Sequence, residues 1–192
     1  MTVQHVILDR DGVLNVEATG GWVLRVQDWR WQEAALEALA ILSPGRTLSV
    51  ATNQSCIGRG LVDAAVIEAV HTRMCAEAAA GGAPFAGVHC CAHSPEEGCR
   101  CRKPEPGLLL QAVGASGIPP EHTVFVGDSE GDLQAARRAE VTPVLVRTGK
   151  GRDTESSSAA TGVAVFDDLL SFAHFLRRGG TLSPSAGRVG TQ

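Results

Sequence analysis

The chain has 192 residues, a formal net charge of −4 and 44% hydrophobic residues. This length suits a single domain, and the composition excludes a wholly disordered or collagen-like chain. No apolar stretch approaches the ~18 residues of a membrane span, and the N-terminal segment lacks the form of a signal peptide, so we expect a cytoplasmic protein without membrane contacts. The acidic excess argues against a dedicated nucleic-acid-binding protein, which would need a basic surface.

Short apolar runs alternate with segments of helical spacing along the chain. Strands are predicted at residues 5–8, 47–51, 87–91, 123–126, 143–146 and 163–166. Helices are predicted at residues 31–42, 62–80, 106–116, 133–140 and 167–177, with a Gly-, Ser- and Thr-rich loop at residues 148–161. This alternation is typical of a Rossmann-like, three-layer α/β fold whose parallel sheet is covered on both faces. We expect one domain over residues 1–177 and a disordered tail over residues 178–192, which contain almost no apolar side chains.

Polar residues follow each of the first four predicted strands. Ligands of open α/β sheets bind beyond the carboxyl ends of the strands, so these residues should share one edge of the sheet. A single Asp at a strand end is commonly a helix cap, but four polar sets at four successive strand ends indicate a reaction site. The sets are Asp9 with Asp11, Thr52 to Ser55, Arg102 with Lys103, and Asp128.

The acidic members of these sets suit phosphoryl transfer. Asp9 and Asp128 follow separate strands and can hold Mg²⁺, which prefers oxygen ligands. A carboxylate such as that of Asp9 can also act as a nucleophile and form an aspartyl-phosphate. Asp11 lies two residues further on, where it can protonate the leaving oxygen and then activate water.

Neutral and basic side chains complete the predicted site. Thr52 and Asn53 would donate hydrogen bonds to the phosphoryl oxygens, and Lys103 would neutralise charge on the transferring group. Gly12 would let the backbone turn tightly beside the metal.

The segment at residues 9–15, DRDGVLN, resembles the first motif of the haloacid dehalogenase superfamily of phosphohydrolases. Thr52, Lys103 and the Gly127-Asp128 pair match the second, third and fourth motifs of that superfamily, in order. One DxDG alone would be weak evidence, whereas all four motifs in order on the expected elements are specific. The resemblance covers roughly residues 5–150 and implies a domain without a separate cap.

The resemblance also implies a role for each acidic residue. Asp9 would be the nucleophile and Asp11 the general acid and base. The magnesium ligands would be the carboxylates of Asp9 and Asp128 and the backbone carbonyl of Asp11, while Asp132 would support the site from behind.

Four of the six cysteines fall within the twelve residues from Cys90 to Cys101. Side chains two apart on an extended chain face the same way, which pairs Cys91 with His93 and Cys99 with Cys101. Three thiolates and one imidazole form a closed tetrahedral zinc site of the structural kind. The alternative is a group of buried or redox-active cysteines.

The pattern CxH…CxCRKP narrows the resemblance to the zinc-bearing branch that contains the D-glycero-D-manno-heptose 1,7-bisphosphate 7-phosphatases and the histidinol-phosphate phosphatase domain. Residues 52–60, TNQSCIGRG, resemble the corresponding stretch of the heptose enzymes. Two departures stand out, since Cys56 replaces a usual Gly and Ser129 a frequent Lys. The substrate-binding residues predicted by position are Glu17, Gly20, Thr52, Asn53, Gln54, Ser55, Arg59, Arg102 and Lys103.

Several residues have two open interpretations. Arg59 would bind a second phosphate or remain a solvated loop residue, and Lys150 would be functional or not. Trp22 would wall the pocket or, with the other two tryptophans, serve packing, which is the commoner use of aromatic side chains. His71 is one of four histidines that receive no role.

These observations predict a Mg²⁺-dependent phosphatase with structural Zn²⁺ that acts as a monomer on a small sugar phosphate. The favoured substrate is the 7-phosphate of a heptose 1,7-bisphosphate, and histidinol phosphate is the alternative. A DNA 3′-phosphatase is disfavoured by the acidic balance and the absence of a basic stripe. A catalytically silent zinc-stabilised binding module is disfavoured because paired carboxylates cost stability without a cation.

Overall fold

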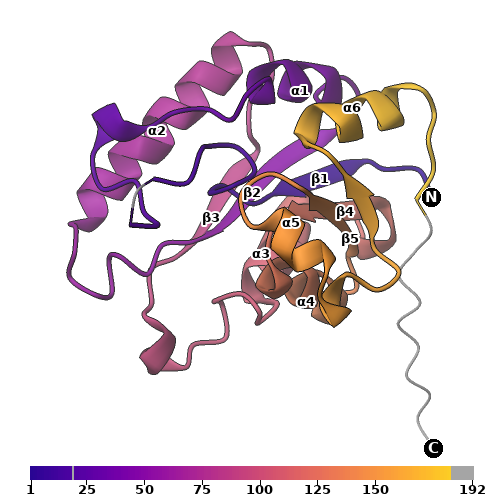
Figure 1. Cartoon of the computed structure of the whole chain (residues 1–192). Helices are drawn as coiled ribbons and strands as arrows, with labels where there is room; N and C mark the ends of the chain where they lie inside the picture. The colour runs from indigo at the N-terminus through magenta and orange to yellow at the C-terminus, as the bar shows by residue number, and fades with distance from the viewer. Residues whose placement is uncertain (19, 183–192) are drawn as a thin grey trace, which may run out of the picture.

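A six-stranded parallel sheet forms the centre of the computed structural model, which describes residues 1–18 and 20–182 (Figure 1). The strand order is β3-β2-β1-β4-β5-β6. The strands are β1 (His5–Leu8), β2 (Thr47–Asn53), β3 (Gly87–Cys91), β4 (Thr123–Gly127), β5 (Thr142–Val146) and β6 (Ala164–Phe166). The predicted Rossmann-like α/β fold is therefore confirmed.

Helices cover both faces of this sheet. On one face lie α1 (Ala35–Leu42), α2 (Ala64–Ala80) and α6 (Leu169–Arg177), and on the other lie α3 (Gly107–Ser116) and α4 (Glu130–Arg138) (Figure 1). Successive residues of β1 therefore serve different cores: Val6 and Leu8 pack with the first group of helices, and Ile7 packs with the second. This is why the strand is a continuous apolar run rather than an alternating one.

Short helices complete the chain. They are α5 (Gly151–Glu155) and the 3₁₀ turns Val26–Asp28, Pro95–Glu97, Pro120–His122 and Ser158–Ala160. The prediction of a continuous loop at residues 148–161 was wrong, because α5 and a 3₁₀ turn lie within it.

Two helix starts differ from their predicted positions by three or more residues. The helix predicted from Trp31 begins at Ala35, because Ala34 has a left-handed backbone with φ of 56°. The helix predicted from Leu133 begins earlier, at Glu130, because Ser129 and Asp132 form a capping box in which each side chain accepts a hydrogen bond from the other's backbone NH.

The strand order reverses between β1 and β4, because the chain leaves β1 toward β2 on one side and returns to β4 on the other. Such a reversal opens a crevice beyond the carboxyl ends of the two strands. The residues that follow β1 and β4 are Asp9 and Asp128, so the topology itself brings the two predicted magnesium ligands to one place.

The packed chain continues past the expected domain boundary at residue 177. Leu182 is buried in the core, and its carbonyl accepts a hydrogen bond from the Met1 nitrogen at 3.1 Å. The expected disorder from residue 178 is therefore corrected for residues 178–182, and residues 183–192 lie outside the described part. Among the described residues, no helix has both the length and the apolar character needed to cross a membrane.

Candidate active site

A cavity of about 350 Å³ lies where β1, β2 and β4 end. Its lining combines carboxylates, a threonine hydroxyl, an asparagine amide and three cationic groups. The predicted residues that line it are Asp9, Asp11, Glu17, Gly20, Thr52, Asn53, Ser55, Arg102, Lys103 and Asp128. The structure thus brings together most of the site that the motifs predict.

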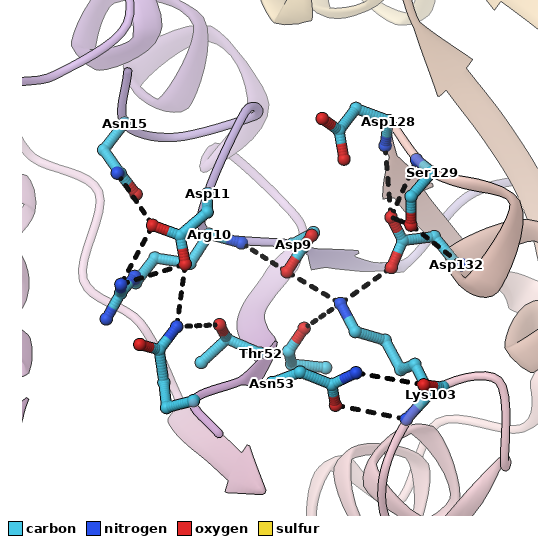
Figure 2. A network of polar contacts seen from close by, with 12 residues as sticks. Asp9, Arg10, Asp11, Asn15, Thr52, Asn53, Lys103, Asp128, Ser129 and Asp132 are labelled. Carbon is cyan, nitrogen blue, oxygen red and sulfur yellow. Dashed lines mark hydrogen bonds and ion pairs between the residues drawn. The ribbon is translucent and has the colours of Figure 1, made fainter. Parts of the chain in front are cut away.

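Lys103 is the buried cation at the centre of the site. Its Nζ lies 2.7 Å from Asp9 Oδ1 and 2.7 Å from Asp132 Oδ1, and it donates to the Ala51 carbonyl at 3.0 Å (Figure 2). Burial alone would lower the pKa of Lys103, but the carboxylates of Asp132 and Asp9 outweigh burial and raise it. Lys103 therefore stays charged beside the predicted nucleophile.

The acidic cluster around Lys103 is short of positive charge. Carboxylate oxygens of Asp9, Asp128 and Asp132 lie within 4.8 Å of one another, and all three residues are buried. Burial and then Asp132 raise the pKa of Asp9, and the same two causes raise the pKa of Asp128 to about 7. Three carboxylates face one ammonium here, which leaves two negative charges uncompensated when all are ionised. A divalent cation with a preference for oxygen, such as Mg²⁺, fits this donor set.

Two glycines shape the backbone around Asp128. Gly12 has φ of 87° and Gly149 has φ of 55°, and a Cβ atom at either would collide with the Asp128 carboxylate. The Lys150 backbone NH donates to Asp128 Oδ2 at 2.8 Å. Glycine is thus required at position 12 by the space as well as by the turn.

The side chain of Asp11 is held by three donors. Arg10 Nη2 lies 2.9 Å from each of its oxygens, Asn15 Nδ2 donates to Oδ1 at 3.0 Å, and Gln54 Nε2 donates to Oδ2 at 2.7 Å (Figure 2). Burial would raise the pKa of Asp11, but Arg10 and these hydrogen bonds outweigh it and lower that pKa. The carboxylate of Asp11 therefore points to a different set of partners from that of Asp9.

Two predicted substrate contacts lie outside the cavity, and a third has another partner. Gln54 is fully buried and bonds to Asp11 and to Thr52 Oγ1 at 2.8 Å. Arg59 is exposed and faces Glu96 at 3.9 Å. Asn53 lines the cavity, but its amide clamps the backbone of Lys103 through bonds of 3.0 and 3.1 Å.

The cavity is also lined by residues whose role the sequence does not decide, or for which it predicts only a supporting role. Trp22, Asp132 and Lys150 line it, and Lys150 Nζ pairs with Glu17 Oε1 at 2.9 Å. Of the two interpretations of Trp22, the structure thus favours the pocket wall, whereas Trp29 is fully buried in the core, as expected for packing. Lys150 follows the fifth strand closely, and this position in the sequence could have indicated that it lies at the site.

The cysteine–histidine cluster has the spacing of a tetrahedral metal site. Cys91 Sγ lies 3.5 Å from His93 Nδ1, 3.6 Å from Cys99 Sγ and 3.4 Å from Cys101 Sγ. Tetrahedral Zn²⁺ with its usual bond lengths would separate its ligands by roughly 3.5–3.8 Å. The four side chains fit zinc, and Cys90 is exposed and outside the group.

The cluster loop is joined to the neighbouring loop by backbone hydrogen bonds. Gln54 N donates to the Cys91 carbonyl at 2.7 Å, and Gly58 N donates to the Ala92 carbonyl at 2.9 Å. A Cβ at Gly58 would collide with this backbone. Backbone hydrogen bonds therefore tie the loop that leads to Lys103 to the loop that follows Thr52.

Fold and site together have the form of a phosphohydrolase of the capless α/β type. A family model described as HAD-hydrolase-like matches residues 100–172. The chain is 44% identical over 177 residues to the D-glycero-beta-D-manno-heptose-1,7-bisphosphate 7-phosphatase of Pseudomonas aeruginosa, covering 92% of this chain and 99% of that relative. It is 42% identical to the enzyme of the same name from Pseudomonas putida, covering 89% of this chain and 98% of that relative.

A solved structure gives the same result. The D,D-heptose 1,7-bisphosphate phosphatase from B. bronchiseptica, complexed with magnesium and phosphate, matches with a TM-score of 0.87 and 36% identity. The match covers 93% of this chain and 100% of that one. The chain belongs to the haloacid dehalogenase-like hydrolases, in the group that these heptose bisphosphate phosphatases form.

Proposed function

We propose that this phosphatase removes the 7-phosphate of a D-glycero-β-D-manno-heptose 1,7-bisphosphate through an aspartyl-phosphate intermediate. The observation that carries the mechanism is the convergence of Asp9, Asp11, Thr52, Lys103 and Asp128 on one cavity. The substrate comes from the names of relatives that match this chain over nearly their whole length.

In the first step, Asp9 attacks phosphorus. Its Oδ1 accepts hydrogen bonds from the Arg10 backbone NH at 2.7 Å and from Lys103 Nζ, while Oδ2 accepts none from the described residues. Oδ2 is therefore the oxygen free to form the new O–P bond as the bond from phosphorus to the sugar oxygen breaks. Asp11 enters this step protonated, although Arg10 lowers its pKa in the free enzyme, and gives its proton to that leaving oxygen.

In the second step, Asp11 acts as a base. It takes a proton from water, the water oxygen bonds to phosphorus, and the bond from phosphorus to Asp9 breaks. Inorganic phosphate leaves, and Asp9 returns to a carboxylate. Lys103 neutralises charge on the phosphoryl group in both steps.

We propose Asp9, Asp128 and the backbone carbonyl of Asp11 as the magnesium ligands. The ion would offset the negative charge of the transferring phosphoryl group and of the acidic cluster. Support comes from the uncompensated charge of that cluster and from the magnesium and phosphate in the B. bronchiseptica structure. Cys91, His93, Cys99 and Cys101 would hold a structural Zn²⁺.

The cavity mouth suits a substrate with a second phosphate. Arg102 and Lys150 both line the cavity, and the Lys150 side chain is 61% exposed at its edge. A heptose bisphosphate that reacts at Asp9 has a further dianionic group to place, and two cations beside the reacting centre can receive it. Arg59 does not line the cavity, so we assign the second phosphate to Arg102 and to Lys150, which would exchange its pairing with Glu17 for the phosphate.

The test is a phosphate-release panel with Mg²⁺ and both anomers of heptose 1,7-bisphosphate, histidinol phosphate and an oligonucleotide 3′-phosphate. We expect the highest kcat/KM for a heptose bisphosphate. Phosphorus NMR of the product should show that the 1-phosphate remains. Preference for histidinol phosphate, or release of the 1-phosphate, would overturn the substrate assignment.

A further inference from the structure

Arg10 is a buried cation that the proposed mechanism leaves without a role. Its side chain is fully buried beside the two predicted catalytic aspartates, although arginine is almost never buried without a partner. One side of the guanidinium is satisfied by Asp11, since Nη2 lies 2.9 Å from both carboxylate oxygens.

His71 on α2 contacts the other side of the guanidinium. Its Nε2 lies 3.2 Å from Arg10 Nη1. Arginine has only donors, so Nε2 must accept this hydrogen bond and the imidazole must be neutral with its proton on Nδ1. Burial, followed by the charge of Arg10, lowers the pKa of His71 to about 4, in agreement with a neutral ring.

A chain of contacts therefore runs from helix α2 to the general acid. His71 fixes Nη1, the rigid guanidinium fork transmits this orientation to Nη2, and Nη2 fixes the carboxylate of Asp11. Gln54 and Asn15 also bond to that carboxylate, at 2.7 and 3.0 Å, but only Arg10 reaches both of its oxygens among the described residues.

We propose that His71 is a positioning residue of this phosphatase, acting through Arg10 to orient the Asp11 carboxyl group for proton transfer to the leaving oxygen. This inference rests on the proposed function for the roles of Asp9 and Asp11. His71 does not touch the reacting atoms, and it does not line the cavity.

Two esters with different leaving groups distinguish a loss of Asp11 positioning from a general loss of structure. An alkyl phosphate needs protonation of its leaving oxygen, whereas p-nitrophenolate leaves readily without it. Because kcat/KM reports on steps up to formation of the aspartyl-phosphate, it isolates the acid role of Asp11 from its later role as a base. General acid catalysis contributes typically ~10²–10⁴-fold.

Three substitutions of His71 and one control separate the outcomes. His71→Leu and His71→Asn remove the acceptor from the position of Nε2, and we expect each to lower kcat/KM for glycerol phosphate ~10-fold or more relative to p-nitrophenyl phosphate. His71→Gln places an amide oxygen near that position and should keep the wild-type ratio. Cys75→Ala, one turn further on the same face of α2 and half-buried like His71, should leave the ratio unchanged.

The positioning role would be overturned if the Leu and Asn variants lost kcat/KM equally on the two esters, or lost none. It would also be overturned if the Gln variant showed the same change in ratio as the Leu and Asn variants. If one of the two acceptor-lacking variants fails to fold, the other decides. The generic esters keep this test separate from the substrate assignment. A wild-type enzyme that hydrolyses these esters but not heptose bisphosphate would overturn only the proposed substrate.

Discussion

Asp9 and Asp128 are buried carboxylates whose ionisation depends on their neighbours. Both carboxylates are buried, and burial raises the pKa of each, so each depends on a nearby positive charge to remain ionised. Lys103 supplies one such charge, and the proposed cation supplies the rest. The proposed nucleophile and the proposed metal ligand are thus ionised together only when these positive charges are present.

Asp9→Asn should abolish phosphate release, with kcat at least ~10³-fold lower, because an amide cannot form the aspartyl-phosphate. Steady-state kinetics on p-nitrophenyl phosphate would measure this. Asp28→Asn, which changes a surface carboxylate paired with Arg25, serves as the control and should keep full activity. Turnover retained by the Asp9→Asn enzyme would contradict the nucleophile assignment.

Gly12→Ala should weaken magnesium dependence as well as activity. The new Cβ would meet the Asp128 carboxylate, and the positive φ of 87° disfavours alanine. We expect a higher Mg²⁺ concentration for half-maximal rate and a loss of about 1–3 kcal/mol in the free energy of unfolding. Gly114→Ala, in α3 with open space at its Cβ, is the matched control and should be neutral or stabilising. An unchanged magnesium requirement in the position-12 variant would count against this geometry.

At the scale of elements, the loop after β3 connects the cysteine–histidine cluster to Lys103. Cys99 and Cys101 stand directly before Arg102 and Lys103, and backbone hydrogen bonds join Cys91 and Ala92 to the loop after β2. This loop has few apolar side chains of its own. A bound metal would therefore fix the position of Lys103 relative to Thr52.

Cys91→Ser should lose bound zinc and lower the Tm by several degrees. It should also raise KM more than substitution of an exposed cysteine does. The physical reason is that the loop then lacks its main anchor. Metal analysis, thermal melts and kinetics in excess Mg²⁺ would test this. Cys90→Ser changes the adjacent exposed cysteine and should keep one zinc per chain. Zinc content that is equal in both variants would refute the assigned ligand set.

His5 at the start of β1 should make folding sensitive to acid. Burial, and then His89, lower the pKa of His5 to about 4, and its Nε2 lies 3.0 Å from Ser49 Oγ. Because the folded state has the lower pKa, the unfolded chain binds more protons between about pH 6.5 and 4. Stability is thus fully present above pH 6.5 and is lost as pH falls toward 4.

Urea unfolding at pH 7 and pH 5 would measure this effect. Between these values His5 should account for a loss on the order of 1 kcal/mol. The free energy of unfolding should fall less between pH 7 and pH 5 in His5→Gln than in the wild-type protein. In His174→Gln, on α6, it should fall as much as in the wild-type protein. The comparison of falls cancels any shared effect of acid on zinc binding. An equal loss of unfolding free energy between pH 7 and pH 5 in the wild-type and His5→Gln proteins would contradict the prediction.

For the whole molecule, the two ends of the described chain meet beside the core. Leu182 is buried among residues of the α1, α2 and α6 face, and its carbonyl accepts a hydrogen bond from the Met1 nitrogen. The segment after α6 therefore packs against the domain as far as Leu182.

A chain ending at residue 177 should be less stable than one ending at residue 182. Burial of a leucine side chain contributes ~1.5–3 kcal/mol, and we expect a loss of about 1–2 kcal/mol because part of the apolar surface stays covered. Urea midpoints of the two chains give the comparison. Equal midpoints would place the end of the domain at residue 177, as the sequence predicts.

Sequence pattern alone determined the α/β class, the succession of strands along the chain and the motifs, because these depend on local periodicity and on residue types at strand ends. The starts of β1, β2, β3 and β4 were predicted to the residue. The helix in residues 151–155 was missed, because Gly, Ser and Thr favour loops unless tertiary packing outweighs their propensity.

Only the tertiary structure decided how the polar side chains divide their partners. Gln54 turned inward to Asp11 and Thr52 rather than toward the cavity, and Asp132 became a direct partner of Lys103. His71 reached Arg10 across 61 positions of sequence. No local spacing encodes such contacts, because they form when a helix packs across a sheet and buried polar groups must each find a partner.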